Sequence, residues 1–417
     1  MTPEIKQRIE QIRRGEVPER YVKTALGLAP ANWKRYTFGD IYTERKEPGD
    51  ENLPLLMVSI HSGVSDGEVD AAELPKQVKR IEDKSQYKKA VSGDLVFNMM
   101  RAWQGAIGAV RTTGMVSPAY IVAEPNDKAY PLFMDYYSRT PQMINQIDRQ
   151  SYGVTDFRKR LYWDSFAPIS CTLPPIEEQQ KIAAILTTQD KVIELKEKRL
   201  AEKQRQKKYL VQQLLTGKKR LPGFSGEWKK TKLKNILYER KTYSPKGLEY
   251  PHVTLSAEGI FPKSERYNRD HLVRDEDKEY KITHKGDICY NPANLKFGAI
   301  CENTFGDAIF SPIYVTFEVE ENICKEYIAN YLMRWDFINA VRKYEEGTVY
   351  ERMAVKPEDF LKFEIFLPQI EEQTAIAEVL SAADREIELL QQDIEQEKQK
   401  KKALMQLLLT GIVRVKI

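Results

Sequence analysis

The stretch "LPPIEEQQKIAAIL" at residues 173–186 returns almost unchanged as "LPQIEEQTAIAEVL" at residues 367–380. Residues 173–217 align with residues 367–411 without a gap, and 21 of the 45 positions are identical. Both copies end in Leu-Leu-Thr-Gly. A gapless match of this length indicates an internal duplication, and a duplication of this kind organises the whole chain.

Shorter echoes extend the duplication to the residues that precede each copy. A Trp-Lys pair followed by Glu-Arg-Lys occurs in both halves, with the tripeptide at residues 44–46 and 239–241. The string Gly-Asp, then Asn, then Gly-Ala-Ile begins at residue 93 and again at residue 286. The chain is therefore predicted to alternate a globe and a long segment twice, with the long segments more alike than the globes.

The two long segments are predicted to be helices. Each begins with Pro and acidic residues, which suit a helix start and its dipole, and each ends in Thr-Gly, a common helix stop. Neither Gly nor Pro interrupts residues 176–215, so the first helix would be roughly 60 Å long. Apolar residues recur every seven positions, with a Lys in one slot of each copy. This heptad seam consists of Leu186, Ile193, Leu200 and Leu214, and of Leu380, Ile387, Ile394 and Leu408, with Lys207 and Lys401 in the matching slots.

Long helices with one apolar seam need a partner, and the other copy is the obvious one. Because the chain travels out along the first helix and must return along the second, the pair is predicted to be antiparallel. Residues 173–220 carry 12 Lys and Arg against 6 Asp and Glu, whereas residues 367–417 carry 7 against 9. Charge therefore does not oppose the pairing. A plain surface helix with a charged tail is the alternative, and the repeated Lys slots argue against it.

The predicted fold is α+β, with two mixed α/β globes separated by two long helices that pair as an antiparallel coiled coil with pseudo-twofold symmetry. Each globe has about 140 residues, which is enough for its own core. The predicted parts are an N-terminal helical segment at 1–32, globes at 33–172 and 221–366, a central helix at 173–220 and a C-terminal helix at 367–417. The segment 1–32 has no counterpart before the second globe. It would either complete the symmetry with a capping helix at 3–14 or be a simple start segment.

Composition and motif content argue against several classes of protein and of functional site. No apolar run approaches the roughly 20 residues that a membrane helix needs, and the N-terminus lacks the apolar core of a signal peptide, so the cytoplasm is the expected location. The four cysteines form no Cys-x-x-Cys and the four histidines are scattered, so no metal site is predicted. No phosphate-binding loop, dinucleotide motif or nucleophile triad stands out, and no residue is predicted to be catalytic.

Polar loops at equivalent places in the two globes are the candidate DNA-binding sites. Arg suits guanine, and Asn or Gln suits adenine, because their donors and acceptors match the base edges, while Lys and Arg also bind phosphates. Any one of these residues could instead be a solvated loop residue. The candidates are Asn98, Arg101, Gln104, Tyr152, Thr155, Arg158, Lys159 and Arg160 in the first globe, and Asn291, Asn294, Lys296, Lys343, Thr348, Tyr350 and Arg352 in the second. Residues 33–172 carry a net charge of 0 and residues 228–366 carry −1, so the basic residues of each globe would have to gather on one face.

Two unlike globes, each closed by a Pro-x-Ile-Glu-Glu-Gln…Leu-Leu-Thr-Gly segment, resemble the DNA-specificity (S) subunit of type I restriction–modification systems over essentially the whole chain. The resemblance implies two target-recognition domains that each read half of a bipartite, asymmetric sequence in double-stranded DNA. It further implies a non-catalytic chain that docks two methyltransferase subunits, through which restriction (translocase) subunits join. S-adenosylmethionine, ATP and Mg²⁺ would belong to those partners. A coiled-coil scaffold with two protein-interaction globes, and an enzyme with an unrecognised motif, are the alternatives.

Overall fold

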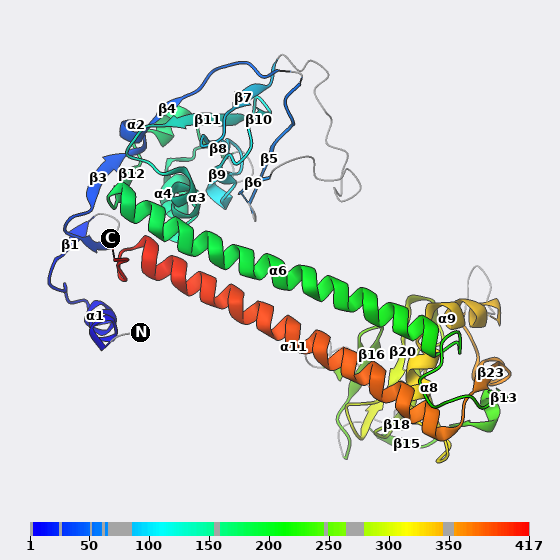
Figure 1. Cartoon of the computed structure of the whole chain (residues 1–417). Helices are drawn as coiled ribbons and strands as arrows, with labels where there is room; N and C mark the ends of the chain where they lie inside the picture. Colours follow the sequence, from blue (N-terminus) through cyan, green and yellow to red (C-terminus); the bar gives the residue numbers. More distant parts are fainter. Residues whose placement is uncertain are drawn as a thin grey trace. The chain divides into compact units, whose positions relative to one another are not determined.

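The computed structural model describes residues 3–24, 27–50, 52–60, 63–65, 86–153, 159–245, 249–263, 279–344 and 354–416. The chain forms two compact units. Unit 1 comprises Met1–Lys196 and Asp393–Ile417, and unit 2 comprises Glu197–Gln392. Each unit therefore contains one globe together with part of both long helices (Figure 1).

The globe of unit 1 is built on a four-stranded antiparallel sheet. Its strand order is β4 (Tyr42–Glu44), β11 (Tyr120–Pro125), β8 (Leu95–Asn98) and β9 (Ile107–Ala109). Two-stranded pairs join β3 (Lys34–Thr37) with β12 (Ser170–Leu173), β7 (Lys88–Ala90) with β10 (Gly114–Val116), and β5 (Met57–Ser59) with β6 (Gly63–Ser65). The globe's helices are α2 (Phe38–Ile41), α3 (Pro131–Tyr137), α4 (Pro141–Gln150) and α5 (Trp163–Phe166).

The globe of unit 2 repeats this sheet. Its order is β14 (Leu237–Glu239), β22 (Val315–Val319), β19 (Ile288–Tyr290) and β20 (Ile300–Glu302), all antiparallel. Around it lie β13 (Lys229–Lys232) with β23 (Glu364–Leu367), β16 (Val253–Ser256) with β17 (Gly259–Pro262), and β15 (Tyr243–Pro245), β18 (Glu279–Thr283) and β21 (Ala308–Phe310) in a three-stranded sheet. The helices are α8 (Lys325–Leu332), α9 (Trp335–Val341) and α10 (Pro357–Leu361).

An ion pair repeated in both globes explains two of the sequence echoes. Arg45 donates two hydrogen bonds to Asp94, at 2.8 and 3.2 Å, and Arg240 donates two to Asp287, at 2.9 and 3.1 Å. Burial raises the pKa of the Asp94 carboxyl, whereas hydrogen bonds to Asp94 raise the pKa of the Arg45 guanidinium. The Arg of Glu-Arg-Lys and the Asp of Gly-Asp therefore form the same ion pair in both globes.

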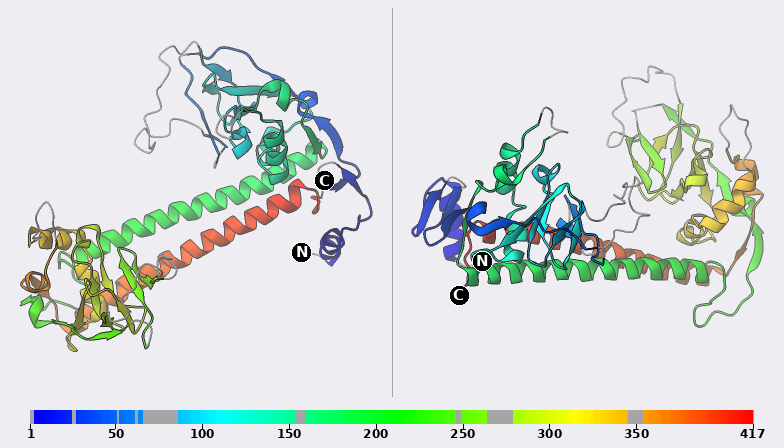
Figure 2. Two further views of the ribbon diagram at one scale, coloured as in Figure 1. Left: turned by 180° about the vertical axis from the view of Figure 1, so that it is seen from behind. Right: turned by 90° about the horizontal axis from the view of Figure 1, so that it is seen from above.

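The long helices are α6 (Ile176–Leu214) and α11 (Ile370–Leu409), with 39 and 40 residues. Within unit 1 the start of α6 lies beside the end of α11 and runs in the opposite direction, and within unit 2 the end of α6 lies beside the start of α11 (Figures 1 and 2). In unit 1, Lys196 contacts Asp393 at 2.8 Å. In unit 2, Lys203 contacts Glu386 at 2.9 Å. The predicted α+β fold with antiparallel helices is confirmed.

The predicted seam residues divide into two sets. Leu200 and Ile387 are only half-buried. The six others, Leu186, Ile193, Leu214, Leu380, Ile394 and Leu408, are buried. Leu186 and Leu408 lie in the core of globe 1, and Leu214 and Leu380 lie in the core of globe 2. The ends of the helices are therefore part of the globes' own cores, which the heptad pattern alone did not predict.

The two Lys slots in the heptads are filled by ion pairs between the helices. Lys401 contacts Asp190 at 2.5 Å in unit 1, and its ammonium also lies 5.6 Å from the centre of the Tyr136 ring. Lys207 forms the matching ion pair with Asp384 in unit 2. Both Asp positions are identical in the two copies of the repeat, so each Lys reaches the same carboxylate on the opposite helix.

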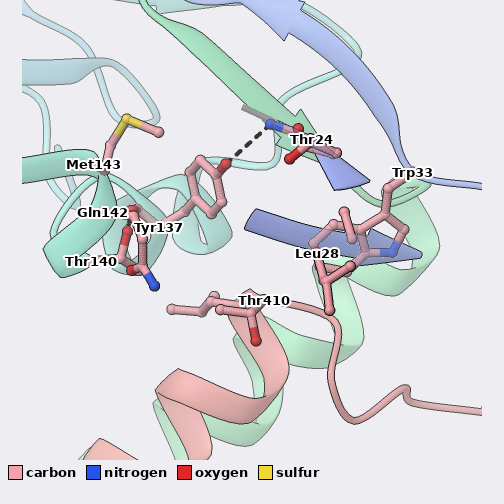
Figure 3. Close-up of a pocket in the computed structure, with 11 residues that line it drawn as sticks. Thr24, Leu28, Trp33, Tyr137, Thr140, Gln142, Met143 and Thr410 are labelled. Carbon is pink, nitrogen blue, oxygen red and sulfur yellow. Dashed lines mark hydrogen bonds between the residues drawn. The ribbon is translucent and has the colours of Figure 1, made fainter. Parts of the chain in front are cut away.

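The N-terminal segment packs at the end of α11 within unit 1. It consists of α1 (Pro3–Arg13) and a hairpin of β1 (Tyr21–Thr24) with β2 (Gly27–Pro30). The Arg8 guanidinium donates to the carbonyl of Ile412 at 3.1 Å, and the Tyr21 hydroxyl donates to that of Gly411 at 2.6 Å. Figure 3 shows the small hollow that remains between this hairpin, α3, α4 and Thr410, where the Thr172 N–H donates to the Tyr137 hydroxyl at 3.0 Å.

Candidate nucleic-acid interface

The loop after the central strand is held by an asparagine in both globes. The Asn98 side-chain oxygen accepts a hydrogen bond from the N–H of Met100 at 2.9 Å, and that of Asn291 accepts one from Ala293 at 3.1 Å. An asparagine that bonds the backbone two residues ahead forms a compact turn. Both asparagines were predicted to contact DNA, and in this structure their oxygens hold the loop.

The remainder of each loop is one short 3-10 turn that ends at a glycine. The turns are Ala102–Gln104 and Leu295–Phe297, and each buries its first residue. Gly105 and Gly298 follow with φ of 101° and 81°, a conformation that favours glycine. The repeated Gly-Ala-Ile string is therefore a requirement of the turn and of the buried strand that follows.

This geometry leaves the remaining loop candidates at the surface. Arg101, Gln104 and Asn294 are exposed, and Lys296 is half-buried. No side-chain hydrogen bond links Arg101, Gln104 or Asn294 to any residue that the structure describes. These three side chains are available to an external ligand, whereas Asn98 and Asn291 are engaged within their own loops.

In unit 1 the second candidate segment lies beside the first. The N–H of Leu161 donates to the carbonyl of Met99 at 2.8 Å. Lys159 pairs with Asp148 at 2.9 Å, and its ammonium lies 5.4 Å from the centre of the Trp103 ring. Tyr152, which is 59% exposed, packs on Tyr162 at 5.6 Å between ring centres, and Arg160 is exposed. Thr155 and Arg158 lie outside the described residues.

In unit 2 the second candidate segment is only partly described. Lys343 is exposed on the 3-10 turn Arg342–Tyr344. The chain that follows the undescribed stretch returns to the loop, because the N–H of Val355 donates to the carbonyl of Pro292 at 3.3 Å. Its own carbonyl accepts a hydrogen bond from the Tyr290 hydroxyl at 3.0 Å. The candidates Thr348, Tyr350 and Arg352 lie outside the described residues.

A hairpin beside each loop was missed by the sequence analysis. The pair β5–β6 contacts β9 in unit 1, and β17 of the pair β16–β17 contacts β20 in unit 2. Gly105 lies close to the carbonyl of Ile60 in the first turn, and Gly298 lies close to the side chain of Ala257 in the second. The alternating "VTLS" before a turn with Gly259 at φ 125° is the signal that would have identified the second hairpin.

The described residues contain no cluster of three or more His, Cys, Asp or Glu side chains arranged to hold a metal ion. All four cysteines are free thiols, and three of them are buried. Burial raises the pKa of Cys171 and of Cys301 to about 12. In the described part of the chain no helix is long and apolar enough to cross a membrane.

Comparison with known proteins gives consistent results. Residues 76–204 and 226–399 match the family described as the type I restriction modification DNA specificity domain. The type I restriction enzyme MjaVIII specificity subunit of Methanocaldococcus jannaschii is 24% identical over 364 residues, which cover 80% of this chain and 83% of that protein.

Two solved structures share the fold. The HsdS subunit from Thermoanaerobacter tengcongensis has a TM-score of 0.50 at 18% identity, with 92% of this chain and 98% of that chain covered. The S subunit of a type I restriction–modification system from M. genitalium has a TM-score of 0.55 at 11% identity, with coverage of 90% and 96%. Two family matches that together span most of the chain, each on a globe with the same sheet, confirm the resemblance: the chain belongs to the type I restriction–modification DNA-specificity family.

Proposed function

We propose that this chain is the non-catalytic specificity subunit of a type I restriction–modification complex and that its two globes read the two halves of a bipartite, asymmetric DNA sequence. The observation that carries the proposal is the pair of equivalent loops. Their frameworks are the same, but their available polar side chains differ, with Arg101 and Gln104 in one and Asn294 in the other. Different side chains on one scaffold are suited to reading different bases.

The helix pair supports docking of two methyltransferase subunits. A repeat that is 21 of 45 residues identical presents two similar surfaces, and similar surfaces bind copies of the same partner. The length of α6, 39 residues, or roughly 58 Å at 1.5 Å per residue, suits a spacer. Restriction (translocase) subunits would join through the methyltransferases. S-adenosylmethionine, ATP and Mg²⁺ would act in those partners, and the assembly would work in the cytoplasm.

The test is a methylation map of DNA from cells with and without this chain. We expect a bipartite, asymmetric motif that is modified only when the chain is present. Exchange of residues 98–104 or 291–296 for those of a relative should change one half of that motif and leave the rate of modification similar. Persistence of the same motif after deletion of the chain would refute the proposal.

A coiled-coil scaffold with two protein-binding globes is the second candidate. The observation that favours it is the charge of the globes, 0 for residues 33–172 and −1 for residues 228–366. The two candidates differ in salt dependence, because a DNA reader that contacts phosphates loses affinity steeply as salt rises. Absence of salt-sensitive DNA binding by the assembled complex would favour the scaffold.

A further inference from the structure

A hollow of about 370 Å³ lies in unit 2 between the hairpin β16–β17 and the loop after β19. The hairpin side contributes Thr254 and Ala257, and the loop side contributes Asn294 and Phe297. Tyr314, just before β22, lines it as well. All of these residues lie in unit 2, so the hollow belongs to one globe.

The polar groups in the hollow are held in place and can still form further hydrogen bonds. The backbone of Asn294 is fixed, because its N–H donates to Asn291 at 3.1 Å and its carbonyl accepts from Phe297 at 2.9 Å. Its side-chain amide has no hydrogen bond to a described residue, so one donor group and one acceptor group are available from a rigid turn. The hydroxyls of Thr254 and Tyr314 lie 3.4 Å apart, and each has further hydrogen-bonding capacity.

The same hollow has an apolar edge with a positive charge beside it. Phe297 is 64% exposed, although a phenyl ring is normally buried. The ammonium of Lys296 lies 5.3 Å from the centre of that ring. An exposed aromatic ring, an available amide and a lysine on one turn match the three surfaces of duplex DNA: the thymine methyl group, the adenine edge and the phosphate.

We propose that this hollow reads an A·T pair in the half-site of the second globe. This inference rests on the proposed function and assigns the reading to particular atoms. The Asn294 amide pairs with N6 and N7 of adenine in the major groove, Phe297 and Ala257 contact the methyl group of a thymine, and Lys296 binds a phosphate. Thr254 and Tyr314 on the other wall read the adjacent base pair through their hydroxyls.

The hairpin is therefore a specificity element and not only support for the sheet. The first globe has a hairpin at the same place, β5–β6, also beside the loop after its central strand. Its sequence, "MVSIHSGVS" at 57–65, differs from "VTLSAEGIFP" at 253–262. The two globes therefore share a hairpin at this place but differ in its amino-acid sequence. This difference is expected if the two half-sites differ.

The experiment uses the complete modification complex in cells, with single-molecule sequencing of the methylated DNA. The variants are Asn294→Ala and Thr254→Val, and Asn235→Ala is the matched control, because Asn235 is an exposed asparagine of the same unit that does not line the hollow. We expect Asn294→Ala to lower discrimination about 5- to 150-fold at one A·T position of one half-site. Thr254→Val should relax a neighbouring position, and Asn235→Ala should leave the motif unchanged.

Two results would overturn the inference while the proposed function stands: an unchanged motif in both hollow variants, or a change confined to the half-site that exchange of residues 98–104 alters. Relaxation at a G·C position in Asn294→Ala would also overturn the adenine assignment. Methylation that does not depend on the chain at all would instead refute the proposed function. The two failures are therefore distinguishable within one set of sequencing data.

Discussion

Arg414 and Glu178, which lie 236 residues apart in the sequence, form a two-point ion pair at 2.6 and 2.7 Å. Glu178 lies in the first turn of α6, and its side chain is fully buried. It also accepts a hydrogen bond from the Trp33 indole at 3.3 Å. The hydrogen bonds to Glu178 raise the pKa of the Arg414 guanidinium. The residues just after α11 thus hold the start of α6 against the first globe.

Unit 2 contains the same clamp. Arg220, just after α6, donates to Glu372 in the first turn of α11 at 2.5 Å for both bonds, and the Trp228 indole donates to the same carboxylate at 3.3 Å. Each helix is therefore secured at its start by the residue that follows the other helix. This contact explains the second Glu of the repeated Ile-Glu-Glu-Gln string, because Glu178 and Glu372 are the acceptors.

Loss of one clamp arginine should destabilise its own unit. Arg414→Ala leaves the buried Glu178 carboxylate without its partner, which we expect to cost roughly 2–3 kcal/mol, near the low end for buried pairs because Arg414 is 30% exposed. Arg220→Ala should have a similar effect in unit 2. Thermal and urea unfolding measure both, and Arg205→Ala, an exposed arginine on α6, is the control. An unchanged midpoint in both clamp variants would contradict this role.

Lys207, which occupies an apolar slot of the α6 heptad, should make the helix pair less stable than a leucine at the same position would. Lys207 occupies a seam slot and is 27% exposed, so Lys207→Leu should bury additional apolar surface and stabilise the helix pair by about 1 kcal/mol. The double variant Lys207→Leu with Asp384→Ala removes the unpaired acid and should be at least as stable. Calorimetry of the purified chain measures the effect. A lower melting temperature in both variants would show that the ion pair outweighs apolar packing here.

Acid should weaken the helix pair of unit 1. A hydrogen bond from Gln189, followed by one from Lys196, lowers the pKa of Glu397 from 4.5 to about 2. Because the folded chain favours the carboxylate, these contacts contribute to stability above pH 4.5, and their contribution is lost as the pH falls towards 2. Unfolding midpoints of the wild type and Glu397→Gln should therefore converge over this window. Glu395 accepts a hydrogen bond from Gln399 within its own helix, so the unfolding midpoint of Glu395→Gln should run parallel to that of the wild type.

Asn98 and Arg101, two residues of one loop in the first globe, should respond differently to substitution by alanine. Asn98→Ala removes the hydrogen bond to Met100 and should cost about 1 kcal/mol of stability. Arg101→Ala removes an exposed side chain and should leave stability within about 0.5 kcal/mol, while relaxing one position of the half-site. Unfolding curves and a methylation map of the same two variants test this division. The assignment fails if Arg101→Ala leaves the motif unchanged.

The sequence predicted the structure best in the parts of the chain that are repeated. The two long helices followed from residues 173–217 and 367–411, which repeat without a gap, because each copy must satisfy the same helix ends and the same buried positions. Their antiparallel direction followed from the path of the chain, which leaves along one helix and returns along the other. The candidate site was less predictable. Asn98 and Arg101 look equally polar in the sequence, and only the loop geometry shows that one is bonded internally and the other is exposed. The hairpins were missed because β5 and β16 are only three and four residues long.

By itself, the amino-acid sequence determined that this chain is a duplicated α+β protein with two paired helices, because heptad spacing, helix stops and repeated letters are local properties that need no coordinates. Only the tertiary structure decided which residues close each helix end, as with Arg414 on Glu178, and which polar side chains remain available beside the hairpins. The physical reason is that an ion pair or a hydrogen bond depends on distance in space, and residues more than 200 positions apart acquire that distance only when the chain folds.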